Sequence, residues 1–283
     1  MKIGVSSYSF SQYLRAGKLD LPGVIEKAAE LGFDDIEFTD ITPPEGIDVL
    51  DYATQLRAKA DECGLEVSAH VVYADLAQPD EASLLAEVER VKKLVDVAHA
   101  LGAKFFRHDV MHNYNVFRSF DQALPTIAKG ARMITEYAET KGIRTMTENH
   151  GFICQDSDRV ERLMNAVNHP NYGLLADIGN FLCVDEMPHL ALSKLANFAF
   201  MVHAKDFKVI DFVSASETAG FQTRGCNRLM GVAVGQGRVR VAQCFAILKR
   251  AGFDGYADVE YEGTGDCIDG LKQSLKCLRG IIG

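Results

Sequence analysis

The feature that most constrains this fold is a short unit that recurs along the chain: an Ala-rich helical stretch, one glycine and a short apolar strand. The clearest copies carry their glycine at Gly32, Gly64, Gly102, Gly142 and Gly252. Glycine readily adopts the left-handed conformation that ends a helix, after which the chain can enter a strand. Helices that alternate with strands in this way predict parallel strands joined by right-handed crossovers.

Eight segments have strand-like composition, and helical patterns at 46–63, 80–101, 120–141 and 241–251 lie between them. The predicted strands are 3–8, 35–39, 66–71, 104–108, 143–148, 173–177, 200–205 and 257–261. Strand–helix units of roughly 35 residues, with no linker dividing them, predict one α/β domain over residues 1–283, a (β/α)₈ TIM barrel. An open doubly wound sheet is the alternative, but SSYSFS stands where its Gly-rich nucleotide loop would follow the first strand.

Composition and charge exclude several classes of protein. Hydrophobic residues make up 47% of the chain and charged residues 24%, the balance of a globular protein with a full core. A net charge of −9 disfavours a nucleic-acid partner. No apolar run could cross a bilayer, and the first residues lack the pattern of a signal peptide. Because the seven cysteines form no C-x-x-C pair, we expect reduced thiols in a cytoplasmic protein without a membrane partner.

Ionisable side chains stand at the ends of all predicted strands except the first. A TIM barrel places its chemistry at the carboxyl ends of its strands, so these side chains are expected to meet at one mouth. In chain order they are Glu37, His70, Arg107, His108, Asp109, Glu148, His150, Asp177, His203, Lys205, Asp206, Glu260 and Glu262.

The last four strands carry the most informative set: Glu148, Asp177, His203 and Glu260. Three carboxylates and an imidazole at one mouth would repel one another unless a cation lay between them. An oxygen-rich set with one nitrogen predicts a single divalent metal ion, Mn²⁺ first, with Mg²⁺, Co²⁺ or Zn²⁺ as alternatives. The competing interpretation is that each acid pairs with Lys or Arg at the barrel rim.

The runs TENHG, LADIGN, VHAKD and DVEYEG, in this order, resemble the xylose-isomerase-like barrel family of sugar (phosphate) isomerases and epimerases. That family shares its fold with the second family of AP endonucleases. The resemblance covers nearly the whole chain and implies that Glu148, Asp177, His203 and Glu260 match the family's four metal ligands. It also implies that Glu148 and Glu260 are the catalytic pair that transfers protons in epimerase-type members.

Two positions depart from the pattern of ketose 3-epimerases in this family. Asn180 stands where these enzymes usually carry His, and Val209 stands where they tend to carry Arg. Both positions would contact substrate oxygens near the metal. The departures weaken the assignment to a free-ketose 3-epimerase and leave the metal site itself unchanged.

Further residues are predicted to act around the metal. His150 lies two residues after Glu148 and so faces the same side of an extended chain, where it could be a general base or a positioning residue. Lys205 is expected to face inward and neutralise the acids or bind substrate, and Glu37 to support a neighbouring side chain. The predicted substrate-binding residues are His70, Arg107, His108, Asn180, Lys205, Arg224 and Arg228.

The segment 207–238 is unusually long for a loop of a TIM barrel and is expected to be a lid or binding loop, or an oligomer contact. Its Arg224, Asn227 and Arg228 could bind a phosphate or a glycoside. Aromatic residues could form an apolar wall against a sugar face, although such residues more often belong to the core. These residues are Tyr8, Phe10, Phe117 and Phe181.

The sequence leaves several functions open. The first is a metal-dependent isomerase or epimerase that removes a proton next to a carbonyl of a sugar or sugar phosphate. The second is a lyase that expels a leaving group from a 3-keto sugar or glycoside, because Glu-x-His at 148–150 resembles inositol-type dehydratases and the metal-bearing subunit of C-glycoside deglycosidases. An AP endonuclease is disfavoured by the negative charge, and a non-catalytic carbohydrate-binding barrel by the intact quartet. The expected partners are a carbohydrate substrate, further copies of the chain and, for a lyase, a small partner subunit.

Overall fold

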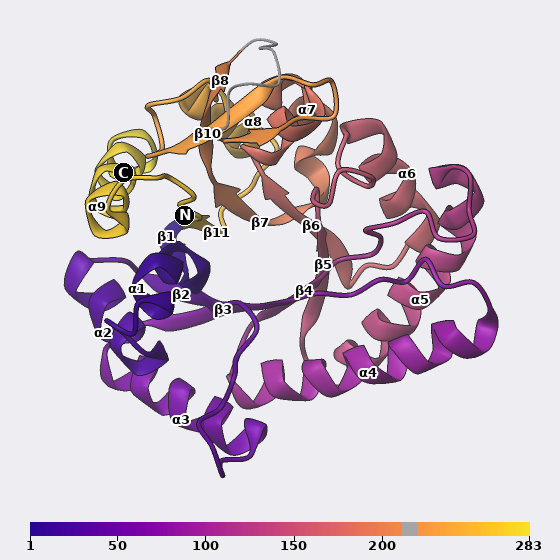
Figure 1. The fold of residues 1–283 in the computed structure, drawn as a ribbon, viewed down its shortest axis with the longest axis horizontal. Helices are drawn as coiled ribbons and strands as arrows, with labels where there is room; N and C mark the ends of the chain where they lie inside the picture. The colour runs from indigo at the N-terminus through magenta and orange to yellow at the C-terminus, as the bar shows by residue number, and fades with distance from the viewer. Residues whose placement is uncertain (211–219) are drawn as a thin grey trace.

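The computed structural model describes residues 1–210 and 220–283, and its centre is a closed barrel of eight parallel strands (Figure 1). Around the barrel the order is β1-β11-β7-β6-β5-β4-β3-β2. The strands are β1 (Lys2–Ser6), β2 (Asp35–Phe38), β3 (Glu66–Val72), β4 (Phe105–His108), β5 (Arg144–Glu148), β6 (Tyr172–Asp177), β7 (Ala199–Ala204) and β11 (Tyr256–Val259). All eight predicted strands are present, and barrel closure confirms the TIM-barrel prediction over the open sheet.

Helices surround the strands, as Figure 1 shows. They are α1 (Ser11–Arg15), α2 (Leu21–Leu31), α3 (Val49–Glu62), α4 (Glu81–Ala100), α5 (Phe120–Glu139), α6 (Ser157–Val167), α7 (Pro188–Leu195), α8 (Val241–Arg250) and α9 (Cys267–Ile282), with 3₁₀ turns η1 (Ser7–Phe10), η2 (Asn180–Val184) and η3 (Ala196–Phe198). Gly32 ends α2 with a φ of 90°, and the other four predicted glycines are likewise left-handed. In the described chain, no helix has the length and apolar character needed to span a lipid bilayer.

The strands separate two apolar layers. Because successive side chains of a strand point to opposite faces, Phe105 belongs to the barrel interior and Phe106 to the layer under the helices. The interior cluster consists of Ala69, Val71, Phe105, Met146, Leu175 and Met201. This packed interior supports the carboxyl ends of the strands, where the predicted site residues lie.

The segment predicted to be a long loop instead contains a small antiparallel sheet of order β8-β10-β9. Its strands are β8 (Asp206–Ile210), β9 (Phe221–Gln222) and β10 (Arg228–Val232). The connection between β7 and α8 is long, as expected, but the sequence analysis did not foresee that its stretches FKVI and RLMGV are apolar enough to pair as strands. Residues 211–219, in the middle of this segment, lie outside the described residues.

The Asp206 carboxylate joins the two ends of the segment 207–239, which contains the small sheet and which we call the excursion. Its Oδ1 accepts hydrogen bonds from the backbone N–H groups of Phe207 (2.9 Å) and Val239 (3.0 Å). Its Oδ2 accepts from those of Gly235 (3.0 Å) and Gly237 (2.8 Å). The excursion therefore begins and ends at one buried side chain directly after β7.

At the opposite end of the barrel, Glu66 joins the beginnings of several strands. Its carboxylate contacts Lys2 and Lys104 and accepts a hydrogen bond of 2.6 Å from the Tyr256 hydroxyl. The hydrogen bonds from Lys104, Lys2 and Tyr256 lower the pKa of Glu66 from 4.5 to about 2. This network lies far from the mouth and has a structural role.

We expect Glu66→Gln to reduce the free energy of unfolding by about 0.5–1 kcal/mol near neutral pH, a modest value because the carboxylate is partly exposed. The folded-state pKa is depressed, so this stabilisation is present above about pH 4.5 and is lost as the pH falls toward 2. Urea unfolding at a series of pH values should show the wild type and variant converging in acid. A pH-independent difference would contradict this assignment.

Candidate functional site

Four side chains from consecutive barrel strands meet at the mouth: Glu148, Asp177, His203 and Glu260. We call these the quartet. One ligand atom from each lies within 4.8 Å of the others. His203 Nδ1 is 3.6 Å from Glu148 Oε1, 4.0 Å from Asp177 Oδ2 and 3.5 Å from Glu260 Oε2. The strand register brings them together, because His203 pairs with Asp177 on β6, and Glu260 directly follows β11.

Local hydrogen bonds orient Asp177 so that one of its oxygens remains available. Oδ1 accepts the backbone N–H groups of Gly179 (2.7 Å) and Asn180 (2.9 Å), while Oδ2 accepts no hydrogen bond. The side-chain amide of Asn149 bonds both the N–H and the carbonyl of Asp177, at 2.9 Å each. The sequence Asp-Ile-Gly-Asn after β6 therefore directs a single carboxylate oxygen into the quartet.

Glu37 orients the imidazole of His203 from the other side. The Glu37 carboxylate lies 2.7 Å from His203 Nε2, and both side chains are fully buried. His203 Nδ1 makes no hydrogen bond and faces the three quartet carboxylates. Glu37 thus supports a neighbouring side chain, as the sequence suggested, in the way that carboxylates orient metal-binding histidines.

Two cations of the chain also reach the quartet. Arg107 lies 2.6 Å from Glu148 Oε2, and Lys205 Nζ lies 2.5 Å from Glu260 Oε2 and 3.2 Å from Asp177 Oδ2. Burial raises the pKa of Glu148, but Arg107 and His203 outweigh it and lower that pKa to about 2. The acids are therefore partly paired with Lys and Arg, as the competing interpretation expected, yet they also converge on one point.

The quartet fits a divalent metal ion. His203 Nδ1 is buried and makes no hydrogen bond in the described part of the chain, and the buried Asp177 Oδ2 and Glu260 Oε2 have Lys205 as a nearby cation. Burial raises the pKa of Asp177 to about 7, and the charges of Glu148 and Glu260 add to this effect despite nearby Lys205. A cation between these atoms would remove that penalty, and three oxygens with one nitrogen suit a metal of the Mn²⁺ or Mg²⁺ type.

A second group of polar side chains lies beside the quartet, at the ends of β4 and β5. Asp109 Oδ1 is 3.0 Å from His150 Nδ1, and Asp109 Oδ2 is 3.0 Å from His112 Nε2. Arg107 lies 2.7 Å from Asp109 and balances its charge, so we interpret this group as a positioning network and not as a second metal site. Tyr73 stacks on His112 with ring centroids 4.6 Å apart.

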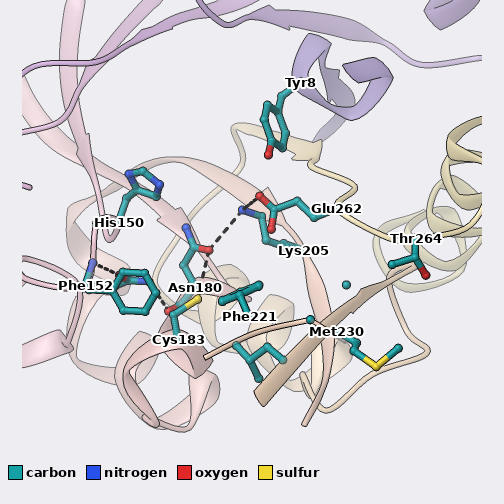
Figure 2. Close-up of a pocket in the computed structure, with 15 residues that line it drawn as sticks. Tyr8, His150, Phe152, Asn180, Cys183, Lys205, Phe221, Met230, Glu262 and Thr264 are labelled. Carbon is teal, nitrogen blue, oxygen red and sulfur yellow. Dashed lines mark hydrogen bonds and ion pairs between the residues drawn. The ribbon is translucent and has the colours of Figure 1, made fainter. Parts of the chain in front are cut away.

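The structure brings some of the predicted substrate-binding residues into the site. Asn180 donates a hydrogen bond of 2.9 Å to Glu148, and Lys205 lies 3.3 Å from the Asn180 side-chain oxygen. Both line a cavity next to the quartet, together with His150 and Tyr8 (Figure 2). Arg107 lines the quartet cavity itself, which has a volume of about 280 Å³.

His70 and His108 do not reach the mouth. Both are buried, and their rings contact Phe106 in the layer beneath the helices. His70 Nδ1 contacts the carbonyl of Phe38, and burial lowers the pKa of each imidazole to about 4. The prediction of substrate contact is corrected for a simple reason: adjacent Arg107 and His108 point to opposite faces of β4, and Arg107 takes the inner one.

Arg224 and Arg228 also have protein partners. The Arg224 guanidinium contacts the carbonyl of Phe152 and lies 2.8 Å from Asp156, so it fixes the backbone after β5. Arg228 lies on β10 and donates to the carbonyl of Gly220. The contacts of Arg224 thus stabilise the backbone, whereas the sequence suggested that this residue binds a phosphate.

The aromatic candidates divide between the core and the site. Phe10 and Phe181 are fully buried in the main core, and Phe117 packs against its edge. Tyr8 is 41% exposed and lines the cavities. Sequence reasoning passed over His112 and gave Asp109 no role, although the motif Arg-His-Asp-x-x-His after a strand could have indicated them.

The chain belongs to the xylose isomerase-like TIM-barrel family, because the model of that family matches residues 25–281. Inosose dehydratase 1 of Bacillus cereus is 26% identical over 158 residues, 55% of this chain and 52% of the relative. An inosose dehydratase of Bacillus anthracis is 25% identical over 210 residues, 69% of each chain. The match thus spans about half the length of the first of these relatives.

Solved structures share the fold along essentially the whole chain. The probable 3-DHS dehydratase AsbF of Bacillus anthracis superposes with a TM-score of 0.75 at 19% identity and covers 99% of both chains. D-Psicose 3-epimerase superposes with a TM-score of 0.74 at 15% identity over 100% of both chains. A xylose isomerase-like protein of Mycobacterium smegmatis, in complex with magnesium, gives 0.71 at 20% identity over 100% of this chain and 98% of that one.

We expect the purified chain to bind one divalent ion through the quartet, and Asp177→Ala or His203→Ala to lose stoichiometric binding. Glu37→Gln should weaken affinity by about 10–100-fold, because it releases the imidazole of His203 from its support. Mn²⁺ titration calorimetry with elemental analysis measures both. Glu66→Gln, at the opposite end of the barrel, is the matched control; metal retained by both alanine variants would show the ligand set to be wrong.

Proposed function

We propose that this chain is a divalent-metal-dependent lyase that removes a proton next to a ketone of a polyol and expels a leaving group from the adjoining carbon. The observation that carries the proposal is the placement of His150. Its imidazole lines both cavities at the mouth, next to Glu148, and is anchored by Asp109. The inosose dehydratases and the probable 3-DHS dehydratase among the similar proteins support a dehydrating reaction.

Asp109 prepares His150 to act as a base. A carboxylate next to Nδ1 favours the tautomer with its proton on that nitrogen, which leaves the lone pair of Nε2 directed away from Asp109. Burial lowers the pKa of His150, but the hydrogen bond and charge of Asp109 outweigh it, so the pKa is raised. The imidazole is therefore fixed in orientation and made more basic, as a general base requires.

The quartet would hold the metal ion, for which Mn²⁺ is our first choice, and the ion would polarise the ketone and stabilise the developing enolate charge. His150 removes the proton on the carbon next to the ketone. The electron pair left behind forms a carbon–carbon double bond, and the bond from the next carbon to its oxygen substituent breaks. The proton taken up by His150 balances the release of the substituent as water or an alcohol.

Asn180 and Lys205 bind the substrate in this proposal. Both line the cavity beside His150. Each donates a hydrogen bond to another side chain, and a hydroxyl group of a polyol can take the place of that acceptor. Lys205 is buried among Asp177, Glu260 and Glu262, so its charge also limits repulsion when the ketone becomes an enolate.

A second candidate is an isomerase or epimerase of a keto sugar. It is favoured by the quartet glutamates, because Glu148 and Glu260 approach the same point from different strands and could serve opposite sides of one carbon. The structural similarity to D-psicose 3-epimerase agrees with it. Asn180 and Val209, which replace the residues usual in such epimerases, favour the lyase.

His150→Ala should separate the two reactions. In a lyase it removes the base, and kcat should fall by about 10³–10⁴-fold while one Mn²⁺ per chain remains bound. In an epimerase it removes only a positioning contact, so the loss should be about tenfold to a hundredfold. Turnover of an inosose and a 3-keto glycoside, followed by absorbance of the conjugated enone, is compared with interconversion of a free ketose.

The matched control is His99→Ala, because His99 is exposed on α4 and distant from the mouth. It should have wild-type turnover. Interconversion of the ketose without enone formation, or full elimination by His150→Ala, would refute the lyase assignment.

A further inference from the structure

A second cavity extends from the quartet toward the small sheet, and we call it the aromatic arm. Its volume is about 380 Å³. It shares Tyr8, His150, Lys205 and Glu262 with the quartet cavity, so the two cavities adjoin at the mouth. The apolar side chains that line it are Tyr8, Phe152, Phe221, Leu229 and Met230.

We propose that the aromatic arm binds an apolar, planar group carried by the substrate. The chain would then act on aryl-substituted polyols, such as aromatic glycosides, in preference to free sugars or sugar phosphates. This inference rests on the proposed function, which places the ketone and hydroxyl groups of the polyol against the quartet.

The aromatic arm is lined by aromatic side chains that are exposed, whereas most large apolar side chains of a folded protein are buried. Tyr8 is 41% exposed, Phe152 42% and Phe221 36%, and these belong to the small set of large apolar side chains that are exposed in the described residues. Isolated exposed apolar side chains are common, but three rings around one cavity form an apolar surface that a ligand can bury. In the view of Figure 2, the ring of Tyr8 lies on one side of Lys205 and Asn180, and the ring of Phe152 on the other.

The backbone holds Phe152 in a conformation that bulky residues seldom adopt. Its φ is +66°, in the left-handed region. The side chain of Gln155 accepts the N–H of Phe152 at 2.5 Å, and Arg224 donates to its carbonyl. Gln155 is itself anchored to the carbonyl of Asn180 at 2.7 Å. Such strain persists only where the surroundings enforce it, which is typical of binding sites.

Among the described residues that line the aromatic arm, the charged ones lie at the end beside the quartet. Lys205, Glu262 and His150 are shared with the quartet cavity, whereas Phe221, Leu229 and Met230 belong only to the far end. Lys205 is the one Lys or Arg among the described residues that line the arm, and it is paired with quartet acids. Arg224 and Arg228 contact the carbonyls of the lining residues Phe152 and Gly220, and neither is among the described residues that line the arm. An aromatic ring at the far end would find aromatic and aliphatic partners there.

The test measures binding without turnover, using probes that lack a ketone. We expect the full chain loaded with Mn²⁺ to bind 4-nitrophenyl β-glucoside at least about tenfold more tightly than methyl β-glucoside in titration calorimetry. Glucose 6-phosphate should bind no better than glucose. Equal affinity for the aryl and methyl glucosides, or preference for the phosphate, would overturn the proposal.

Phe152→Gly is the decisive variant, because glycine adopts a positive φ without strain and the fold should be retained. It should remove most of the aryl preference while leaving affinity for the methyl glucoside unchanged, and Phe221→Ala should act in the same direction. Leu190→Ala, which truncates an exposed residue of α7, is the control and should keep the preference.

Tyr73→Ala tests the opposite side of the mouth, where Tyr73 is 50% exposed and stacks on His112. If Tyr73→Ala removes the aryl preference and Phe152→Gly does not, the aromatic group binds there and the proposal is wrong. Failure of the lyase assay with retained aryl preference would refute the proposed function alone. An active lyase without aryl preference would refute the aromatic arm alone.

Discussion

Electrostatic repulsion among buried carboxylates is the constraint on which the rest of this site depends. Glu148, Asp177 and Glu260 converge on the imidazole of His203, with Glu37 behind it. In a region of low dielectric such a group is stable only if each charge is balanced. The chain supplies Arg107 and Lys205 as internal counter-charges and arranges backbone N–H groups around Asp177. The ligand atoms of the four side chains still face one common point, and a metal ion fits there.

The same balance connects the quartet to the proposed base. Arg107 contacts both Glu148 and Asp109, and Asp109 in turn holds His150. One guanidinium therefore fixes the separation between the quartet and the imidazole that would work beside it. Both contacts are made by one terminal nitrogen of the guanidinium, which lies 2.7 Å from Asp109 and 2.6 Å from Glu148.

The barrel and the quartet could be predicted from the sequence because both follow from local rules. Helix–glycine–strand units fix the phase of the strands, and the carboxyl ends of parallel strands must share one mouth. The same rules would have excluded His108, since Arg107 and His108 are neighbours on one strand and cannot both face inward. The same alternation places His70 on the outer face, because its neighbours Ala69 and Val71 line the barrel interior, but the sequence EVSAHVV does not show which of the two faces is the inner one.

Other features depend on contacts between distant segments and have no local signal. The φ of Phe152 is enforced by Arg224, which lies 72 residues later in the chain. The pairing of Asp109 with His150 joins the ends of two strands. In the segment after β7, polar and apolar residues alternate too weakly for the sequence to distinguish a small sheet from a loop. Phosphate binding by Arg224 was a reasonable expectation from composition, but its backbone partners appear only in three dimensions.

The hydrogen bonds of Asp206 make the small sheet structurally separate from the barrel strands. One carboxylate binds the backbone at Phe207 and at Val239, so the two ends of this segment are held together. Strand β7 ends at Ala204, before the segment starts. Insertions or substitutions within that segment can alter one wall of the mouth without shifting any barrel strand. A change confined to this segment would therefore alter one wall of the mouth while the quartet keeps its place on the barrel strands.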